Sequence, residues 1–135
     1  MRYFEILEHE ADVGLSISGK TLEELFKNAA LALFSLITDI EHVEATTTRN
    51  IYISGDGGLL IVFLNELLYV LDTERFLVKD LSVSIEGERL EACVQGEIFD
   101  EKKHTMRMEI KAVTYHGFSI EKERDALKAR VILDI

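Results

Sequence analysis

The feature that most constrains the fold is a segment in the middle of the chain that is apolar on nearly every side. It follows Asp56-Gly57-Gly58 and runs to about Leu71. Its length and composition predict a helix, and a helix that is hydrophobic all round has to be covered on more than one side. We therefore expect a sheet on one side of it and another helix, or a partner chain, on the other. Its apolar members are Leu59, Leu60, Ile61, Val62, Phe63, Leu64, Leu67, Leu68 and Val70.

A second helix is predicted earlier in the chain. Thr21-Leu22-Glu23-Glu24 has the form of a capping box, in which Thr21 caps the helix and Glu24 reaches back to the backbone amide of Thr21. The helix is expected to end near Thr38-Asp39. Apolar residues recur behind the cap at helical spacing and form one continuous core face: Leu22, Leu25, Phe26, Ala29, Ala30, Leu33, Phe34 and Ile37.

Most of the remaining chain has the patterns of strands. Apolar and polar residues alternate from Leu90 to Ile98, and Glu86-Gly87-Glu88 predicts a hairpin turn that joins this strand to one through Val83 and Ile85. Alternation returns from Met106 to Ala112, after an expected loop at Asp100 to Lys103. Further strands are predicted at Phe4 to Leu7, Val13 to Ser18, Thr47 to Ser54, Phe118 to Glu121 and Ala129 to Ile135.

These elements predict an α+β fold in which two helices pack on a mostly antiparallel sheet. The 135 residues, 47% of them hydrophobic, suffice for one ordinary core. No linker divides the chain. We expect a single compact domain over residues 1–135.

Charge and composition narrow the function classes. The 15 basic residues against 25 acidic ones give a formal net charge of −10, which argues against a protein that binds nucleic acid by itself. The amino terminus has no apolar signal region, and the longest strongly apolar run, Leu59 to Leu64, is too short to cross a bilayer. Cys93 is the only cysteine, so no disulfide forms within the chain. We expect a soluble cytoplasmic protein without a membrane partner.

The common catalytic motifs are absent from the sequence. There is no glycine-rich phosphate loop, no metal-binding cysteine pair, no His-Glu-x-x-His and no serine nucleophile elbow. A conventional enzyme is not indicated.

One candidate site joins the two ends of the chain. If the last strand ends beside the first, then Asp12, Asp134 and the terminal carboxylate of Ile135 form an oxygen-rich cluster of the kind that hard cations bind. The plainer interpretation of Asp12 alone is a turn residue that accepts backbone hydrogen bonds. Asp134 favours a functional interpretation, because the apolar residues before it predict that the chain is still anchored there.

Three further polar residues have both a plain and a functional interpretation. Glu66 interrupts the most apolar helix beside Asn65 and is more simply a solvated residue. Lys111 is placed to contact a phosphate or carboxylate, although a lysine on a sheet surface is commoner. His9, like His104 and His116, is more often structural than a ligand when it stands alone.

The chain resembles the archease family over its whole length and in order. The resemblance is carried by motifs from both ends and from the centre: His9-Glu10-Ala11-Asp12-Val13-Gly14, Thr21-Leu22-Glu23-Glu24-Leu25-Phe26, Leu64-Asn65-Glu66-Leu67-Leu68-Tyr69, Lys103-His104, Glu109-Ile110-Lys111-Ala112-Val113-Thr114-Tyr115-His116 and Asp134-Ile135.

The resemblance implies a protein cofactor rather than a catalyst. Archeases activate the tRNA-splicing RNA ligase, which joins RNA ends through a guanylylated histidine. They promote its guanylylation and multiple turnover and broaden the nucleoside triphosphates it accepts. The family's divalent-metal site, usually described as calcium, maps onto Asp12, Asp134 and Ile135, with magnesium and manganese as alternatives. His9, Glu66 and Lys111 lie in matching motifs and are candidates for contact with the ligase or the nucleotide.

Two other function classes stay open. The first is a small metal-dependent hydrolase or metabolite-binding module built on His9, Asp12 and Asp134, which would need a pocket. The second is a chaperone-like or structural interaction protein. The expected state is a monomer or a weak homodimer, since the apolar central helix is able to contact a second chain.

Overall fold

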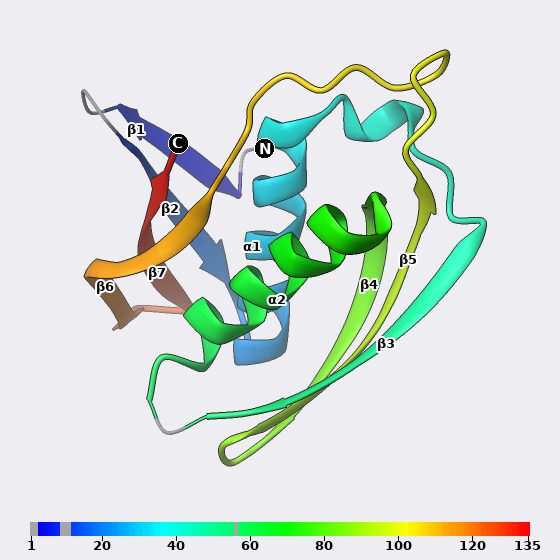
Figure 1. Cartoon of the computed structure of the whole chain (residues 1–135). Helices are drawn as coiled ribbons and strands as arrows, with labels where there is room; N and C mark the ends of the chain where they lie inside the picture. Colours follow the sequence, from blue (N-terminus) through cyan, green and yellow to red (C-terminus); the bar gives the residue numbers. More distant parts are fainter. Residues whose placement is uncertain (1–2, 9–11, 56) are drawn as a thin grey trace.

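The structure is a computed structural model that describes residues 3–8, 12–55 and 57–135 (Figure 1). No helix in these described ranges is long and apolar enough to cross a membrane. The elements in chain order are β1 (Phe4–Glu8), β2 (Asp12–Gly19), α1 (Leu22–Ile37), the 3-10 helix η1 (Ile40–His42), β3 (Thr47–Ser54), α2 (Leu59–Glu74), β4 (Phe76–Glu86), β5 (Arg89–Ile98), β6 (Ala112–Glu123) and β7 (Ala126–Asp134).

The strands form two antiparallel sheets. One has the order β1-β2-β7-β6 and joins the two ends of the chain, and the other has the order β3-β5-β4. Figure 1 shows the two helices between the sheets. Helix α1 packs on β4 and β2, whereas α2 packs on β6, β4 and β3. The α+β prediction with antiparallel pairing is confirmed, and the sheet is divided in two because the apolar central helix needs cover on more than one side.

The helix starts follow local chemistry. Thr21 Oγ1 accepts the backbone N–H of Glu24 at 3.1 Å, so Thr21 caps α1 as predicted. Glu24 also reaches back, but its Oε1 accepts the N–H of Lys20 at 3.1 Å, one residue before the Thr21 amide that the prediction named. Helix α2 begins differently, after Gly58 in the left-handed conformation at φ 71°. A Cβ at Gly58 would lie 2.5 Å from Cε1 of Tyr115, so any other residue there would also displace that ring.

Several predicted boundaries are wrong: β6 begins at Ala112 and not at Phe118, and β7 begins at Ala126 and not at Ala129. The alternating segment from Met106 to Ala112 is not a strand: apart from an isolated bridge between Thr38 and Met106, it crosses between the sheets as an extended connection, and β6 begins only at Ala112. Side-chain alternation reports an extended backbone, whereas a strand also needs a neighbour with which to exchange hydrogen bonds. Helix α2 also continues past Leu71 to Glu74.

Candidate functional site

Asp12 and Asp134 lie directly opposite each other on neighbouring strands. Asp12 is the first residue of β2, Asp134 is the last of β7, and the two are register partners. Directly paired residues project from the same face of a sheet with their Cβ atoms about 4.5–5.5 Å apart. The structure therefore brings these two predicted site residues together, as the sequence suggested if the last strand ended beside the first.

The two carboxylates occupy the face of this sheet that is turned away from the helices. Val13, Leu15 and Leu133, which alternate with them, are buried in the core. Because successive side chains point to opposite faces, Asp12 and Asp134 project outward. A pocket of about 250 Å³ opens beside Asp12. Its other lining residues are His116, Gly117, Arg130 and Ile132.

Asp12 carries a buried oxygen that is not satisfied. Oδ1 of Asp12 has no hydrogen-bond partner, and within the described ranges only Oγ1 of Thr114 shares this state. Thr114 pairs with Ile132 on β7, so the two unsatisfied atoms flank the last residues of that strand. A buried polar group without a partner costs about 1–3 kcal/mol, which a ligand can offset.

The donors at this place suit a hard cation. Among the described residues, no three His, Cys, Asp or Glu side chains converge closely enough to hold a metal ion by themselves. A cation here would take oxygens from Asp12 and Asp134, with the α-carboxylate of Ile135 as the additional donor, and Ile135 is 39% exposed. The unsatisfied Oδ1 of Asp12 fits such an ion.

Of the other predicted contact residues, only Lys111 is shown to adjoin the candidate site. The backbone N–H of Lys111 donates to the carbonyl oxygen of Asp134 at 2.8 Å, so Lys111 adjoins the candidate site through its main chain while its side chain is exposed. Glu66 is half-buried on α2. The prediction for His9 lies outside the described residues.

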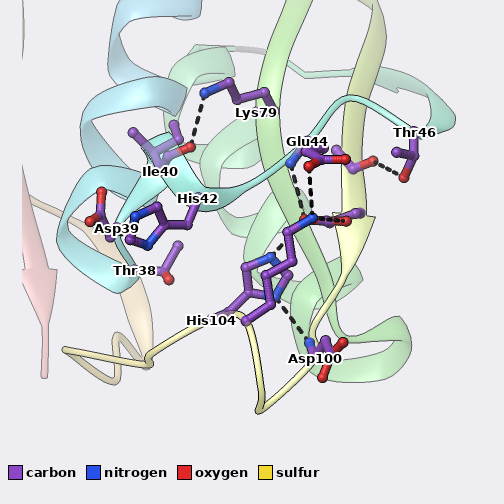
Figure 2. A network of polar contacts seen from close by, with 12 residues as sticks. Thr38, Asp39, Ile40, His42, Glu44, Thr46, Lys79, Asp100 and His104 are labelled. Atoms are coloured by element: carbon purple, nitrogen blue, oxygen red, sulfur yellow. Dashed lines mark hydrogen bonds and ion pairs between the residues drawn. The ribbon is translucent and has the colours of Figure 1, made fainter.

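A second polar cluster includes Glu44, Asp100 and His104 (Figure 2), and its hydrogen bonds converge on Glu97 of β5. Glu97 Oε1 accepts hydrogen bonds from the backbone N–H of Glu44 at 3.0 Å and from His104 Nε2 at 2.7 Å. Its Oε1 also lies 2.8 Å from the ammonium of Lys103. Burial alone would raise the pKa of Glu97, but these hydrogen bonds and the charge of Lys103 outweigh it and lower the pKa to about 2.

The same cluster determines the state of His104, whose side chain is fully buried. The backbone N–H of Asp100 donates to Nδ1 at 3.0 Å, so Nδ1 carries no proton. Nε2 then carries the proton and donates it to Glu97, which makes the imidazole neutral. Lys103, whose pKa the hydrogen bond to Glu97 raises, bridges to Glu44 at 3.2 Å. Neither of the two buried side-chain atoms that lack a partner in the described ranges belongs to this arrangement, so we assign it to tethering the 99–105 loop to β5 and to the segment that follows η1.

The sequence does not single out two residues that make important contacts in the structure. Asn65 stands out only as the neighbour of Glu66, yet its side chain forms hydrogen bonds with both backbone groups of Val113. Glu97 was one outward residue in an alternating strand. The available signal for Asn65 was its position on an otherwise apolar helix, where a polar side chain needs a partner.

Comparison with known proteins agrees with this architecture. The model of the Archease protein family matches residues 4–135. The curated protein archease of Pyrococcus abyssi is 39% identical with all of both chains covered, and that of Methanothermobacter thermautotrophicus is 41% identical with the same coverage.

Solved structures show the same fold. The solution structure of Protein 1598 from Methanobacterium thermoautotrophicum superposes with a TM-score of 0.82 at 39% identity, covering all of both chains. A crystal structure of an archease from Thermotoga maritima, described as a possible chaperone, has a TM-score of 0.67 at 24% identity, covering 100% of this chain and 98% of that one. With a family model matching nearly its whole length and relatives at about 40% identity, the chain belongs to the archease family.

Proposed function

We propose that this protein is an activator of the tRNA-splicing RNA ligase and not itself the catalyst. It would promote guanylylation and multiple turnover of the ligase and broaden the nucleoside triphosphates that the ligase accepts. Family membership supports the proposal in general. The observation that carries it is specific: Asp12, with an unsatisfied buried oxygen, faces Asp134 where the chain ends.

The proposed site holds a divalent cation, with calcium as the expected ion and magnesium or manganese as alternatives. Asp12, Asp134 and the terminal carboxylate of Ile135 would supply its oxygens. When bound, the ion supplies positive charge that can bind and polarise phosphate oxygens. The residues of this chain hold the carboxylates together against their mutual repulsion and present them on the open face of the sheet.

Charge supports docking on a basic partner. A net charge of −10 would steer this protein toward the basic groove in which an RNA ligase holds its substrate. Glu66 and Lys111 are secondary candidates for contact with the ligase or its nucleotide, and His9 is a third. Association should weaken steeply as salt rises, because charge steering is screened beyond about 10 Å at 0.1 M ionic strength. A flat response to salt would argue against this docking mode.

The test is a time course of guanylylation and multiple-turnover ligation by the RNA ligase from the same source. GTP and Mn²⁺ are supplied, and this protein is added in substoichiometric amount as wild type or Asp12→Ala. Acceleration by the wild type that is lost in the variant would support a catalytic activator acting through Asp12. No acceleration by either protein would refute the proposed function.

The geometry gives less support to the alternatives. The pocket beside Asp12, about 250 Å³, is smaller than the roughly 300–1,000 Å³ typical of small-molecule sites, which disfavours a hydrolase or metabolite-binding module. Turnover of a phosphorylated substrate by the isolated protein, abolished in Asp12→Ala, would support that alternative. A chaperone should bind its partners regardless of metal or of Asp12; the Thermotoga maritima relative is described as a possible chaperone.

A further inference from the structure

Asn65 on α2 occupies the place that a neighbouring strand would take beside β6. Its Nδ2 donates to the carbonyl oxygen of Val113 at 2.8 Å, and its Oδ1 accepts the N–H of Val113 at 2.9 Å. β6 is an edge strand of its sheet, so these two backbone groups would otherwise lack a strand partner. One side-chain amide therefore satisfies both the donor and the acceptor of an edge residue.

This contact lies one residue along β6 from the position that pairs with the candidate site. The residue before Val113 is Ala112, which pairs with Asp134, and Asp134 in turn pairs with Asp12. The N–H of Lys111 also donates to the carbonyl oxygen of Asp134 at 2.8 Å. The side-chain amide of Asn65 thus holds β6, β6 pairs with β7, and β7 pairs with β2 at Asp12.

Few other hydrogen bonds hold the segment that precedes Val113 and leads into β6. The connection that enters β6 makes backbone hydrogen bonds from Arg107 to Ile37 and from Lys111 to Asp134, and no ladder is formed over 107–111 in the described structure. Helix α2 itself is fixed by the core, since Leu64 and Leu68 on either side of Asn65 are buried. A side chain on a rigid helix is a more precise support than a loop.

We infer that Asn65 is a positioning residue for the proposed ion site, holding the edge of β6 to α2 so that Asp134 and the chain end stay aligned with Asp12. Only the expected effect on ion binding rests on the proposed function; the role of Asn65 in holding the β6 edge does not. Asparagine suits the task because aspartate has the same shape but lacks the N–H that Val113 O accepts.

The experiment compares Asn65→Asp with Asn28→Asp. Asn28 on α1 is a matched control, because its Nδ2 donates to the carbonyl oxygen of Ser18 at 2.8 Å, at the other end of β2. Two quantities are measured at a temperature where all variants are folded: the amide exchange rate of Lys111 by NMR, without ion or ligase, and the Kd for Ca²⁺. Asn65→Ala, which adds no charge, is measured in parallel.

We expect Asn65→Asp, which loses the hydrogen bond to Val113 O, to speed exchange of the Lys111 amide and to weaken Ca²⁺ binding, each by about 5- to 10-fold, the effect of one ordinary hydrogen bond. Asn65→Ala, which loses both hydrogen bonds to Val113, should have at least as large an effect on both quantities. Asn28→Asp should leave both quantities unchanged. The carboxylate introduced in Asn65→Asp would by itself favour a cation, so weaker binding there cannot come from charge.

Unchanged Lys111 exchange in both Asn65 variants would overturn the inference, as would an equal loss of Ca²⁺ affinity in Asn28→Asp. If the wild type binds no Ca²⁺, the ion proposal fails, and the exchange rates still decide whether Asn65 holds the β6 edge.

Discussion

Asp12, the first residue of β2, and Asp134, the last of β7, face each other as direct register partners, two like charges in a pairing that destabilises a sheet. Neighbouring Val13 and Leu133 form an ordinary buried apolar pair at the next position. The fold thus keeps two carboxylates opposed beside a well-packed core, with one oxygen buried and unsatisfied, and the proposed ion site would account for this cost in stability.

The first prediction concerns this opposition. Asp12→Asn removes one of the two charges, so the free energy of unfolding without divalent ions should rise by about 0.5–1 kcal/mol. If the proposed site binds Ca²⁺, the ion should stabilise the wild type, and Asp12→Asn should remove that stabilisation. Thermal unfolding with EDTA and with Ca²⁺ measures both effects. Asp125→Asn, at an exposed position in the turn between β6 and β7, is the control and should show neither effect. A stability loss in Asp12→Asn under EDTA would contradict the prediction.

The second prediction concerns acid stability. The pKa of Glu97 is lowered from its ordinary 4.5 to about 2, so its stabilising contribution is complete above pH 4.5 and is lost as pH falls toward 2. Glu97→Gln should therefore lower the free energy of unfolding at pH 7 and flatten its pH dependence between 4.5 and 2, as measured by urea denaturation across that range.

A pair of lysine variants tests the cause of that pKa. Lys103→Met removes the ammonium next to Glu97, whereas the neighbouring Lys102→Met removes an equal charge from an exposed position in the same turn. Only Lys103→Met should move the acid limb of the stability curve to higher pH. Equal shifts in both variants would mean that general surface charge, and not the contact with Glu97, sets the pKa.

The third prediction separates backbone strain from packing at the start of α2. Gly57 and Gly58 both have positive φ, at 76° and 71°, but a Cβ on Gly57 would meet nothing within 4 Å, whereas one on Gly58 would press on Tyr115. Gly57→Ala should cost about 1 kcal/mol for the left-handed backbone alone. Gly58→Ala should cost at least 1 kcal/mol more, because overpacking adds to it. Chemical denaturation measures both, and equal losses would show that Tyr115 moves aside freely.

The fourth prediction addresses the chain end. Appending Gly-Ser after Ile135 moves the α-carboxylate away from Asp12 and Asp134, so the proposed site loses one charged ligand and Ca²⁺ affinity should fall at least tenfold. Isothermal titration measures the affinity. The same dipeptide inserted beside Gly87, in the exposed β4–β5 turn, should leave it unchanged. Full affinity in the extended chain would exclude the terminal carboxylate from the site.

Local sequence determined the elements whose causes are local. The capping box at Thr21 fixed the start of α1, the alternation from Leu90 to Ile98 matched β5, and the turn at Gly87 formed where predicted, at φ 59°. Each of these features depends on contacts within a few residues, or on a periodic pattern that places apolar side chains on the face toward the core. The apolar central helix likewise predicted cover on more than one side, which the two sheets provide.

Tertiary structure decided the pairings. The segment from Met106 to Ala112 alternates like a strand but lies between two sheets, and no local pattern states whether a neighbour is present. Asp12 and Asp134 are 122 positions apart in the chain, so their opposition could be stated only as a condition on where β7 ends. The role of Asn65 was also hidden, because a side chain's partner across 48 positions is set by how α2 docks on β6. Hydrogen-bond partners and register belong to the assembled sheet, whereas propensity and periodicity belong to the segment.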